Sequence, residues 1–235
     1  MIVVVIPTYN EAEKIASVLR GIPYGIDRIL VVNDGSNDAT KSVVAREGAR
    51  DKRIVPLLHE RNFGMGKALR TGILHAFRQL QANVIVTLDA DGEHDPSELP
   101  KLLDRLSRDG ADLVLGQRDR TRMPIGRACS IILNAALIRM VCGLAVYDSQ
   151  SGLRAFRASL VPRLSLSGDG YEFTTRFLID VARAKTKVSY VQIKTILPRR
   201  RITQYRRAPF SIAKVIREMV RAVLRRDPRS VSYSK

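Results

Sequence analysis

The chain of 235 residues is 45% hydrophobic and 27% charged, which excludes a disordered protein and gives enough length for one full hydrophobic core. Its net charge is +17 and its isoelectric point is near 10.5, which suits an anionic partner such as a nucleic acid or a membrane surface. Zinc-ligand spacing and RNP-type aromatic motifs are both absent from the sequence, so we expect no nucleic-acid partner.

Apolar, β-branched runs alternate with amphipathic helical patterns along the first half of the chain. The apolar runs predict strands, in chain order, over residues 2–6, 28–33, 53–58, 83–88 and 111–116. The helical patterns between them predict helices over residues 11–20, 65–80 and 97–108. Near-continuous apolar strands separated by helices indicate a mainly parallel, Rossmann-like α/β sheet with helices on both faces.

Polar residues follow three of these strands, at the edge where a parallel sheet binds its ligands. PTYNE follows the first strand, DGSND the second and DADGEHDP the fourth. Asp89 and Asp91 stand two residues apart and Glu93 repeats the step, so an extended backbone would present three carboxylates on one side. Carboxylates bind hard cations such as Mg²⁺ or Mn²⁺, which can neutralise charge on an anionic ligand. A metal site is therefore one interpretation of this segment.

Turn and helix formation offer structural interpretations of the same polar segments. Residues 95–98 (DPSE) are typical of a helix start with Asp95 as its cap, which is compatible with a metal site just before it. Asp34 precedes a Gly-Ser pair and suits a turn. Gly64 and Gly66, at the start of the second predicted helix, suit a close approach of the backbone to a ligand.

The longest apolar segment runs over residues 128–147. Asn134 and Arg139 interrupt it, and an arginine at mid-bilayer costs about 2.5–3.5 kcal/mol, so we expect no membrane span. Cys129 and Cys142 lack CxxC spacing and companion histidines, which argues against a disulfide framework or a zinc site and favours a reducing, cytoplasmic compartment. The chain opens without a basic leader, so we expect no signal peptide.

Short motifs occur in the order found in glycosyltransferase family 2, namely VVIPTYNE, VVNDGSNDAT, NFGMGKALRTGI, VTLDADGEHDP, GQR and DSQSGLRAF. The chain resembles that family over residues 2–195, and more narrowly the polyprenyl-phosphate hexose synthases, which include dolichyl-phosphate mannose synthase. The resemblance implies a GT-A fold and a metal-dependent, inverting transfer of a hexose, mannose first and glucose second. The donor would be GDP-mannose or UDP-glucose, and the acceptor a dolichyl or polyprenyl phosphate at the cytoplasmic face of a membrane.

The resemblance also implies which residues contact the nucleoside of the donor. These residues are Pro7, Tyr9, Glu11, Asp34 and Lys67. Asp34 would hold the base or the ribose, and Lys67 would lie near the nucleotide. Tyr9 offers a flat face and a hydroxyl, although a surface aromatic after a strand is the structural alternative.

The metal and diphosphate motif of the family matches Asp89, Ala90 and Asp91, with Asp91 as a catalytic candidate. Glu93 completes the implied metal ligands, Asp89, Asp91 and Glu93. It stands where the family commonly has glutamine. A carboxylate still ligates a metal there, but its extra charge alters the expected metal affinity and donor preference.

A phosphate acceptor is ionised at neutral pH, so its attack needs no strong base, and cations that orient it suffice. Arginines suit this role because their planar fork bonds two phosphate oxygens. The candidates are Arg118, Arg127 and Arg154, with Ser130 close enough to assist, and the resemblance favours Arg118 and Arg127. If the acceptor were a hydroxyl, Asp148 would be the base. The catalytic candidates are thus Asp91, Arg118 and Asp148.

Other transferases share parts of this pattern. An enzyme with a soluble small acceptor would use the same donor half, so it remains the alternative. A nucleotidyltransferase would want a glycine-rich, basic first loop, whereas PTYNEAE is acidic. A processive polysaccharide synthase would show a QxxRW motif, and this chain has no tryptophan.

The resemblance ends in a basic C-terminal segment, because Lys194–Lys235 holds 13 basic and two acidic side chains. We expect a catalytic domain over 1–195, with a nucleotide-sugar half at 1–117 and an acceptor half at 118–195, followed by a basic loop and helix at 196–235. Related synthases often carry an RxxGxSK-like segment, where this chain reads PRRRITQYRRAP. The candidate ligands there are Arg200, Arg201 and Arg206.

Residues 209–226 predict an amphipathic helix with one apolar and one basic stripe. Such a helix suits the interface of an anionic membrane. It also suits a terminal helix docked on the core with a solvated back, and both interpretations remain open. No hydrophobic anchor follows it in the sequence, so membrane residence would call for a membrane partner subunit.

Overall fold

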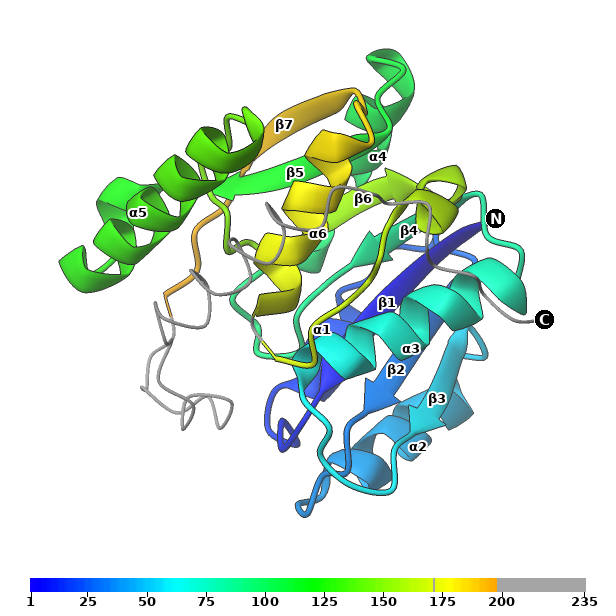
Figure 1. Ribbon diagram of the computed structural model, residues 1–235. Helices are drawn as coiled ribbons and strands as arrows, with labels where there is room; N and C mark the ends of the chain where they lie inside the picture. Colours follow the sequence, from blue (N-terminus) through cyan, green and yellow to red (C-terminus); the bar gives the residue numbers. More distant parts are fainter. Residues whose placement is uncertain (171, 198–235) are drawn as a thin grey trace.

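The computed structural model describes residues 1–170 and 172–197 and contains one seven-stranded sheet with helices on both faces (Figure 1). The strand order is β3-β2-β1-β4-β6-β5-β7. The strands are β1 (Ile2–Thr8), β2 (Arg28–Asn33), β3 (Ile54–Leu58), β4 (Val84–Thr87), β5 (Leu113–Arg118), β6 (Arg154–Arg157) and β7 (Val188–Ile193). The predicted mainly parallel α/β sheet is confirmed.

One strand runs against the others. β6 is antiparallel to its neighbours β4 and β5, whereas the remaining strand pairs are parallel. The first residue of β6, Arg154, therefore lies opposite Thr87 of β4 and Leu115 of β5. The segment that leads into β6 consequently reaches the edge where β1, β4 and β5 end.

The helices form two layers, with α3 and α6 on one face of the sheet and α1, α2 and α4 on the other (Figure 1). The α-helices are α1 (Ile15–Arg20), α2 (Thr40–Arg50), α3 (Met65–Arg78), α4 (Leu99–Arg108), α5 (Ile125–Cys142) and α6 (Glu172–Arg183). Three short 3-10 helices are η1 (Pro96–Glu98), η2 (Arg120–Arg122) and η3 (Ala158–Arg163).

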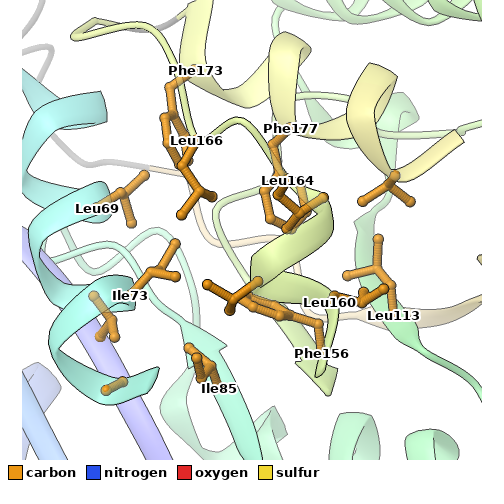
Figure 2. Close-up of a cluster of buried hydrophobic side chains, with 14 of the residues drawn as sticks. Leu69, Ile73, Ile85, Leu113, Phe156, Leu160, Leu164, Leu166, Phe173 and Phe177 are labelled. Atoms are coloured by element: carbon orange, nitrogen blue, oxygen red, sulfur yellow. The ribbon is translucent and has the colours of Figure 1, made fainter. Parts of the chain in front are cut away.

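A buried apolar cluster joins the sheet to α3 and α6 (Figure 2). Leu69 and Ile73 enter it from α3 at the four-residue spacing that predicted this helix. Phe156 of β6 meets Phe177 of α6 edge to face, with ring centroids 5.4 Å apart. Because this packing fixes β6, it also fixes the loop just before β6, which belongs to the polar edge of the sheet.

Local hydrogen bonds explain where the elements differ from the sequence-based prediction. The first helix begins at Ile15 instead of residue 11, and residues 12–14 form a turn. The N–H of Glu11 donates to Thr40 Oγ1 (2.9 Å), which holds this loop against the start of α2. Asp95 caps η1 as predicted, because its Oδ1 accepts the N–H of Ser97 (3.0 Å).

α5 is long and apolar enough to cross a membrane by length and composition alone, among the described residues. It packs against α6, and its Asn134 faces the protein, where its side-chain amide donates to Ser149 Oγ (3.1 Å) and Thr175 Oγ1 (3.3 Å). The opposite face exposes residues at helical spacing, which we call the α5 apolar stripe: Ile125, Cys129, Ile132, Leu133, Ala136 and Met140.

Candidate active site

The polar segments predicted at the ligand edge meet there in the structure. β1, β2 and β4 end in parallel at this edge, and the loop before β6 joins them because β6 is antiparallel. Thr87, the last residue of β4, donates its hydroxyl to the carbonyl of Gly152 (2.7 Å) in that loop. We call residues 89–95 the acidic turn and residues 148–152 the acceptor loop.

The acidic turn is a turn and not an extension of β4. β4 ends at Thr87, so the two-residue alternation that predicted carboxylates on one side does not apply. Asp91 nevertheless feels the charges of Asp89 and Glu93. Burial and these two charges raise the pKa of Asp91 to about 6. Its Oδ1 accepts the N–H of Glu93 (2.9 Å). Asp91 is thus a carboxylate under repulsion from two others.

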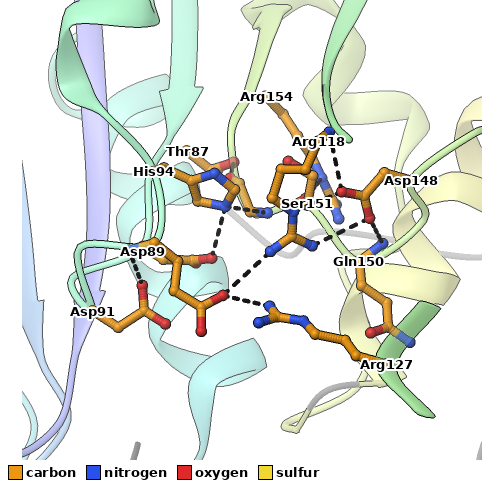
Figure 3. Close-up of polar contacts among 12 residues, drawn as sticks. Thr87, Asp89, Asp91, His94, Arg118, Arg127, Asp148, Gln150, Ser151 and Arg154 are labelled. Atoms are coloured by element: carbon orange, nitrogen blue, oxygen red, sulfur yellow. Dashed lines mark hydrogen bonds and ion pairs between the residues drawn. The ribbon is translucent and has the colours of Figure 1, made fainter. Parts of the chain in front are cut away.

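Asp89 lies against His94 and the acceptor loop (Figure 3). Its Oδ2 lies 3.4 Å from Nε2 of His94, a residue that is 1% exposed. Burial alone would raise the pKa of Asp89, but the hydrogen bond with His94 and the charges of Arg118 and Arg154 lower it. Asp89 therefore stays ionised beside Asp91.

Glu93 is turned toward the arginines. Its Oε2 accepts from Nη1 of Arg118 (3.3 Å) and from Nη2 of Arg127, and the two arginines converge in Figure 3. In the described part of the chain, no three His, Cys, Asp or Glu side chains gather as a preformed metal centre. The three-carboxylate centre expected from the spacing of Asp89, Asp91 and Glu93 is thus not preassembled.

Asp148 is bound to Arg118 and cannot serve as a base in this arrangement. Nε of Arg118 donates to its Oδ2 (2.7 Å) and Nη2 to its Oδ1 (3.2 Å), while Gln150 N–H also donates to Oδ1 (3.1 Å). Burial opposes ionisation, but the charge and hydrogen bonds of Arg118 lower the pKa of Asp148 below its ordinary value. In this arrangement the carboxylate that would be the base for a hydroxyl acceptor is paired with Arg118.

Arg127 and Ser130 lie in the first turns of α5 and face the acceptor loop. Arg127 keeps 31% of its side chain exposed beside Glu93. Ser130 Oγ accepts from Nε2 of Gln150 (3.1 Å). These two residues can reach a ligand that enters from solvent.

Arg154, a predicted candidate ligand of the acceptor phosphate, is buried behind the acceptor loop. It is 4% exposed, its Nε donates to the carbonyl of Ser151 (3.0 Å), and its guanidinium lies 5.2 Å from the ring centre of Phe177. Burial lowers the pKa of Arg154 to about 10 against the charges of Asp89 and Asp148. It remains a cation, and its charge acts on Asp89 and Asp148.

The first loop brings Glu11 to the acidic turn. Glu11 is 6% exposed, and burial and nearby carboxylates, Asp91 foremost, raise the pKa of Glu11 to about 7 against the charge of Lys14. Pro7 is buried in β1 beyond the residues that pair with β4, so its missing N–H leaves that ladder intact. Tyr9 is half-buried just after β1.

Asp34 is occupied by protein donors. It is fully buried, and it contacts Nδ1 of His59 (2.7 Å) and accepts the N–H groups of Phe63 (3.0 Å) and Gly64 (2.8 Å). His59 Nε2 in turn lies 3.0 Å from Thr71 Oγ1 on α3. The side chain of Asp34 therefore anchors the 59–64 loop, and its placement does not support the predicted contact with the base or ribose.

Gly64 and Gly66 admit a neighbouring loop where we had expected a ligand. A Cβ at Gly64 would lie 2.2 Å from the carbonyl oxygen of Asp169, and one at Gly66 would lie 2.3 Å from that of Gly168. The N–H groups of Gly66 and Lys67 donate to the carbonyl of Asp169. Lys67 is half-buried in the first turn of α3, beside this contact.

The residues of the acidic turn fit a divalent cation of the Mg²⁺ or Mn²⁺ type. They supply oxygen donors, and Asp91 lies under repulsion that a cation would relieve. Mg²⁺ is usually held by one or two carboxylates together with substrate phosphates, so a preformed cage is not required. Asp89 and Asp91 are the pair that fits, whereas Glu93 is engaged with arginines.

Sequence reasoning missed two participants in this site, Thr87 and His94, and did not foresee the contact between Gly152 and Asp89. His94 lies inside the quoted motif DADGEHDP, but a histidine among acidic residues is typical of an exposed loop, so its burial could not be foreseen. The antiparallel direction of β6, which brings Gly152 to Asp89, has no sequence signal in a four-residue strand. The tail candidates Arg200, Arg201 and Arg206 and the helix predicted at 209–226 lie outside the described residues.

Comparisons with known proteins agree with this architecture. Residues 3–159 match the family Glycosyl transferase family 2. UDP-N-acetylglucosamine–dolichyl-phosphate N-acetylglucosaminyltransferase of Methanococcus voltae is 32% identical over 83% of this chain and 86% of its own. Polyprenol monophosphomannose synthase of Mycolicibacterium smegmatis is 32% identical over 70% of this chain and 64% of its own.

A solved structure shares the fold. Glucosyl-3-phosphoglycerate synthase from Mycobacterium tuberculosis, crystallised with Mg²⁺ and UDP, superposes with a TM-score of 0.71 at 22% identity and covers 95% of this chain and 77% of its own. At this identity the likeness concerns the fold alone. The match over residues 3–159 and the two relatives show that the chain belongs to glycosyltransferase family 2, with a GT-A fold.

Proposed function

We propose that this protein transfers a hexose from a nucleoside-diphosphate sugar to a polyprenyl or dolichyl phosphate at the cytoplasmic face of a membrane. The observation that carries the proposal is the Arg118–Asp148 ion pair. The carboxylate of Asp148, which a hydroxyl acceptor would need as its base, is paired with Arg118. The site therefore suits an acceptor that is already ionised. Relatives whose names record dolichyl and polyprenol phosphate chemistry support the same acceptor class.

The donor would lie between the first loop and the acidic turn. Tyr9, Glu11 and Lys67 line the approach to the nucleoside in this proposal, and Asp89 and Asp91 would hold Mg²⁺ or Mn²⁺ against the diphosphate. The cation would neutralise the charge that develops on the departing diphosphate. Structural neighbours crystallised with UDP and either ion support a divalent metal.

The acceptor phosphate would lie beside α5. Arg127 and Ser130 would bind its oxygens, with Arg118 behind them, because charge-assisted bonds from arginine suit phosphate. One phosphate oxygen would attack the anomeric carbon and form the new C–O bond while the bond to the nucleoside diphosphate breaks. The leaving group departs as the nucleoside diphosphate, and no proton has to be removed from the acceptor. On this account, residues 1–117 bind the donor and residues 118–195 the acceptor.

The α5 apolar stripe is the surface that we propose rests on the membrane. Ile125 and Met140 are 82% and 79% exposed at its two ends, and the exposed cations Arg122 and Arg139 lie beside it. Apolar and basic side chains together suit an anionic lipid surface. α5 would lie in the interface and not span it, because Asn134 on its other face is bonded inside the protein.

A donor and acceptor screen tests the proposed function. Purified protein would receive GDP-mannose, UDP-glucose or UDP-N-acetylglucosamine with a polyprenyl phosphate and either Mg²⁺ or Mn²⁺, and lipid-linked sugar would be measured. We expect one donor to give product with metal and none with a chelator, with mannose tried first and glucose second. Transfer only to a soluble phosphorylated acceptor would favour the alternative function.

Replacing Arg127 with alanine should weaken acceptor use more than donor binding. We expect the KM for polyprenyl phosphate to rise by about 10–100-fold, since one charge-assisted hydrogen bond contributes about 1.5–3 kcal/mol. The KM for the nucleotide sugar should stay within about twofold of wild type. Steady-state kinetics with each substrate varied in turn measures both values, and an unchanged acceptor KM would contradict the assignment of Arg127.

Placing a glutamate in the α5 apolar stripe should release the protein from membranes. Ile132→Glu and Leu133→Glu put charge on side chains that are 49% and 47% exposed, so the fold should persist. Leu58→Glu is the matched control, because Leu58 is 54% exposed on the opposite edge strand, β3. We expect co-sedimentation with anionic vesicles to fall only for the two α5 variants, whereas equal binding of all three would contradict the surface.

A further inference from the structure

The carboxylate of Asp89 is enclosed by two groups that the proposed chemistry does not use. On one side is the buried ring of His94, whose Nε2 lies 3.4 Å from Asp89 Oδ2. On the other is Gly152, where an added Cβ would lie 2.0 Å from the same oxygen. Real Cβ atoms do not approach an oxygen so closely, so only glycine leaves room for the carboxylate in this position.

The two groups are also bonded to each other. The N–H of Gly152 donates to Nε2 of His94 (3.2 Å), and the carbonyl of Gly152 accepts from Thr87 Oγ1 (2.7 Å). Gly152 is therefore held at its carbonyl by the end of β4 and at its N–H by the acidic turn. Its position, and with it the room left for Asp89, follows from these two bonds.

The ring of His94 is committed to this contact. Nε2 faces both the Gly152 N–H and the Asp89 carboxylate, while Nδ1 is buried with no hydrogen-bond partner among the described residues. Nε2 can hydrogen-bond to only one of these partners at a time: with the ring proton on Nδ1 it accepts the Gly152 N–H, and with the proton on Nε2 it donates to Asp89. This orientation links the acidic turn to the acceptor loop through one ring nitrogen.

We propose that His94 and Gly152 form a positioning pair that fixes the Asp89 carboxylate and couples the acidic turn to the acceptor loop. The inference rests on the proposed role of Asp89 as a carboxylate that meets the cation and diphosphate. His94 and Gly152 are positioning residues, since they act through Asp89. Residues that orient a metal-binding group from behind typically change affinity or activity by about 10–100-fold when replaced.

Metal-dependent nucleotide binding tests the pair without requiring turnover. UDP and GDP would each be titrated calorimetrically into wild-type protein with Mn²⁺ and with a chelator, and the tighter nucleotide carried forward. We expect Gly152→Ala and His94→Leu to weaken Mn²⁺-dependent binding about tenfold, with chelator values unchanged. His94→Gln, which keeps a polar nitrogen or oxygen near Nε2, should stay within about threefold of wild type.

Two controls separate positioning from folding. Gly25→Ala adds a methyl group where nothing lies within 4 Å, so its binding and melting temperature should match wild type. Thr87→Val removes the bond to the Gly152 carbonyl without adding atoms near Asp89, so it tests the pair even if Gly152→Ala fails to fold. It should weaken Mn²⁺-dependent binding in the same direction.

Three results would overturn the positioning pair. They are unchanged binding in His94→Leu, equal losses in His94→Leu and His94→Gln, and no Mn²⁺-dependent binding of UDP or GDP by wild type. Failure of the proposed acceptor chemistry gives another result. Transfer to polyprenyl phosphate would then be absent, but Mn²⁺-dependent nucleotide binding would still be weaker in His94→Leu and Gly152→Ala than in wild type.

Discussion

Replacing Asp91 with asparagine should lower kcat/KM for sugar transfer by at least about a hundredfold. The reason is that Asp91 lacks an ion-pair partner among the described contacts and is instead crowded by Asp89 and Glu93, so a cation is the charge that it is arranged to meet. Asparagine keeps the shape and one oxygen but removes the charge. Rates at saturating Mn²⁺ with both substrates varied would measure the loss.

The same variant should fold as well as wild type. Removing one of three neighbouring negative charges relieves repulsion in the metal-free protein, so the melting temperature should stay equal or rise. Asp104→Asn is the matched control, because Asp104 is 51% exposed on α4 and, among the described residues, forms a salt bridge only with Arg108. Full activity in Asp91→Asn would contradict the assignment of Asp91 to the active site. A large fall in the melting temperature of Asp91→Asn would mean that its loss of activity comes from unfolding.

Replacing Arg118 with methionine should lower the free energy of unfolding by about 3–5 kcal/mol, because it leaves a buried carboxylate without its cation. Arg118 and Asp148 are each 2% exposed, and their side chains are joined by two hydrogen bonds. Arg122→Met is the matched control, since Arg122 is 71% exposed beside Asp119, and exposed pairs contribute about 0–1 kcal/mol. Urea unfolding of the three proteins measures the differences.

A double variant shows whether the loss comes from the stranded charge. Adding Asp148→Asn to Arg118→Met removes the uncompensated carboxylate at nearly constant shape, so the double variant should recover at least about 1 kcal/mol. Asp148→Asn alone would be measured as well. If the losses of unfolding free energy in the two single variants simply add in the double variant, Arg118 and Asp148 do not interact as the structure has them. Sugar transfer should be lost in both Arg118 variants.

The sheet could be predicted from the sequence because its strands are buried on both faces. The runs at 2–6 and 28–33 carry little but apolar residues, and this pattern has few alternatives in a chain with helical segments between the runs. β6 and β7 were missed because RAFR and VSYVQI mix polar and apolar residues over short lengths. Phe156 of β6 packs on Phe177 of α6, a contact between residues 21 positions apart that no sequence pattern indicates.

The site could be predicted as a set of residues but not as a set of contacts. Asp89, Asp91, Arg118 and Arg127 were all named from motifs and chemistry, and the structure brings them to one edge of the sheet. Their partners depend on tertiary geometry, which is why Asp148 proved to be paired with Arg118 and Asp34 to be enclosed by the 59–64 loop. Burial of His94 and the fit of Gly152 against Asp89 are likewise invisible to spacing.

Comparing three acceptors under identical conditions tests the central claim, which is that the acceptor arrives already ionised. The protein would be given its preferred nucleotide sugar and metal with polyprenyl phosphate, with the corresponding polyprenol, or with a soluble phosphorylated acceptor, and labelled product would be counted. We predict transfer to polyprenyl phosphate and none to polyprenol. Comparable transfer to polyprenol would contradict the account, because the site would then have to supply a base that Asp148, bound to Arg118, does not offer.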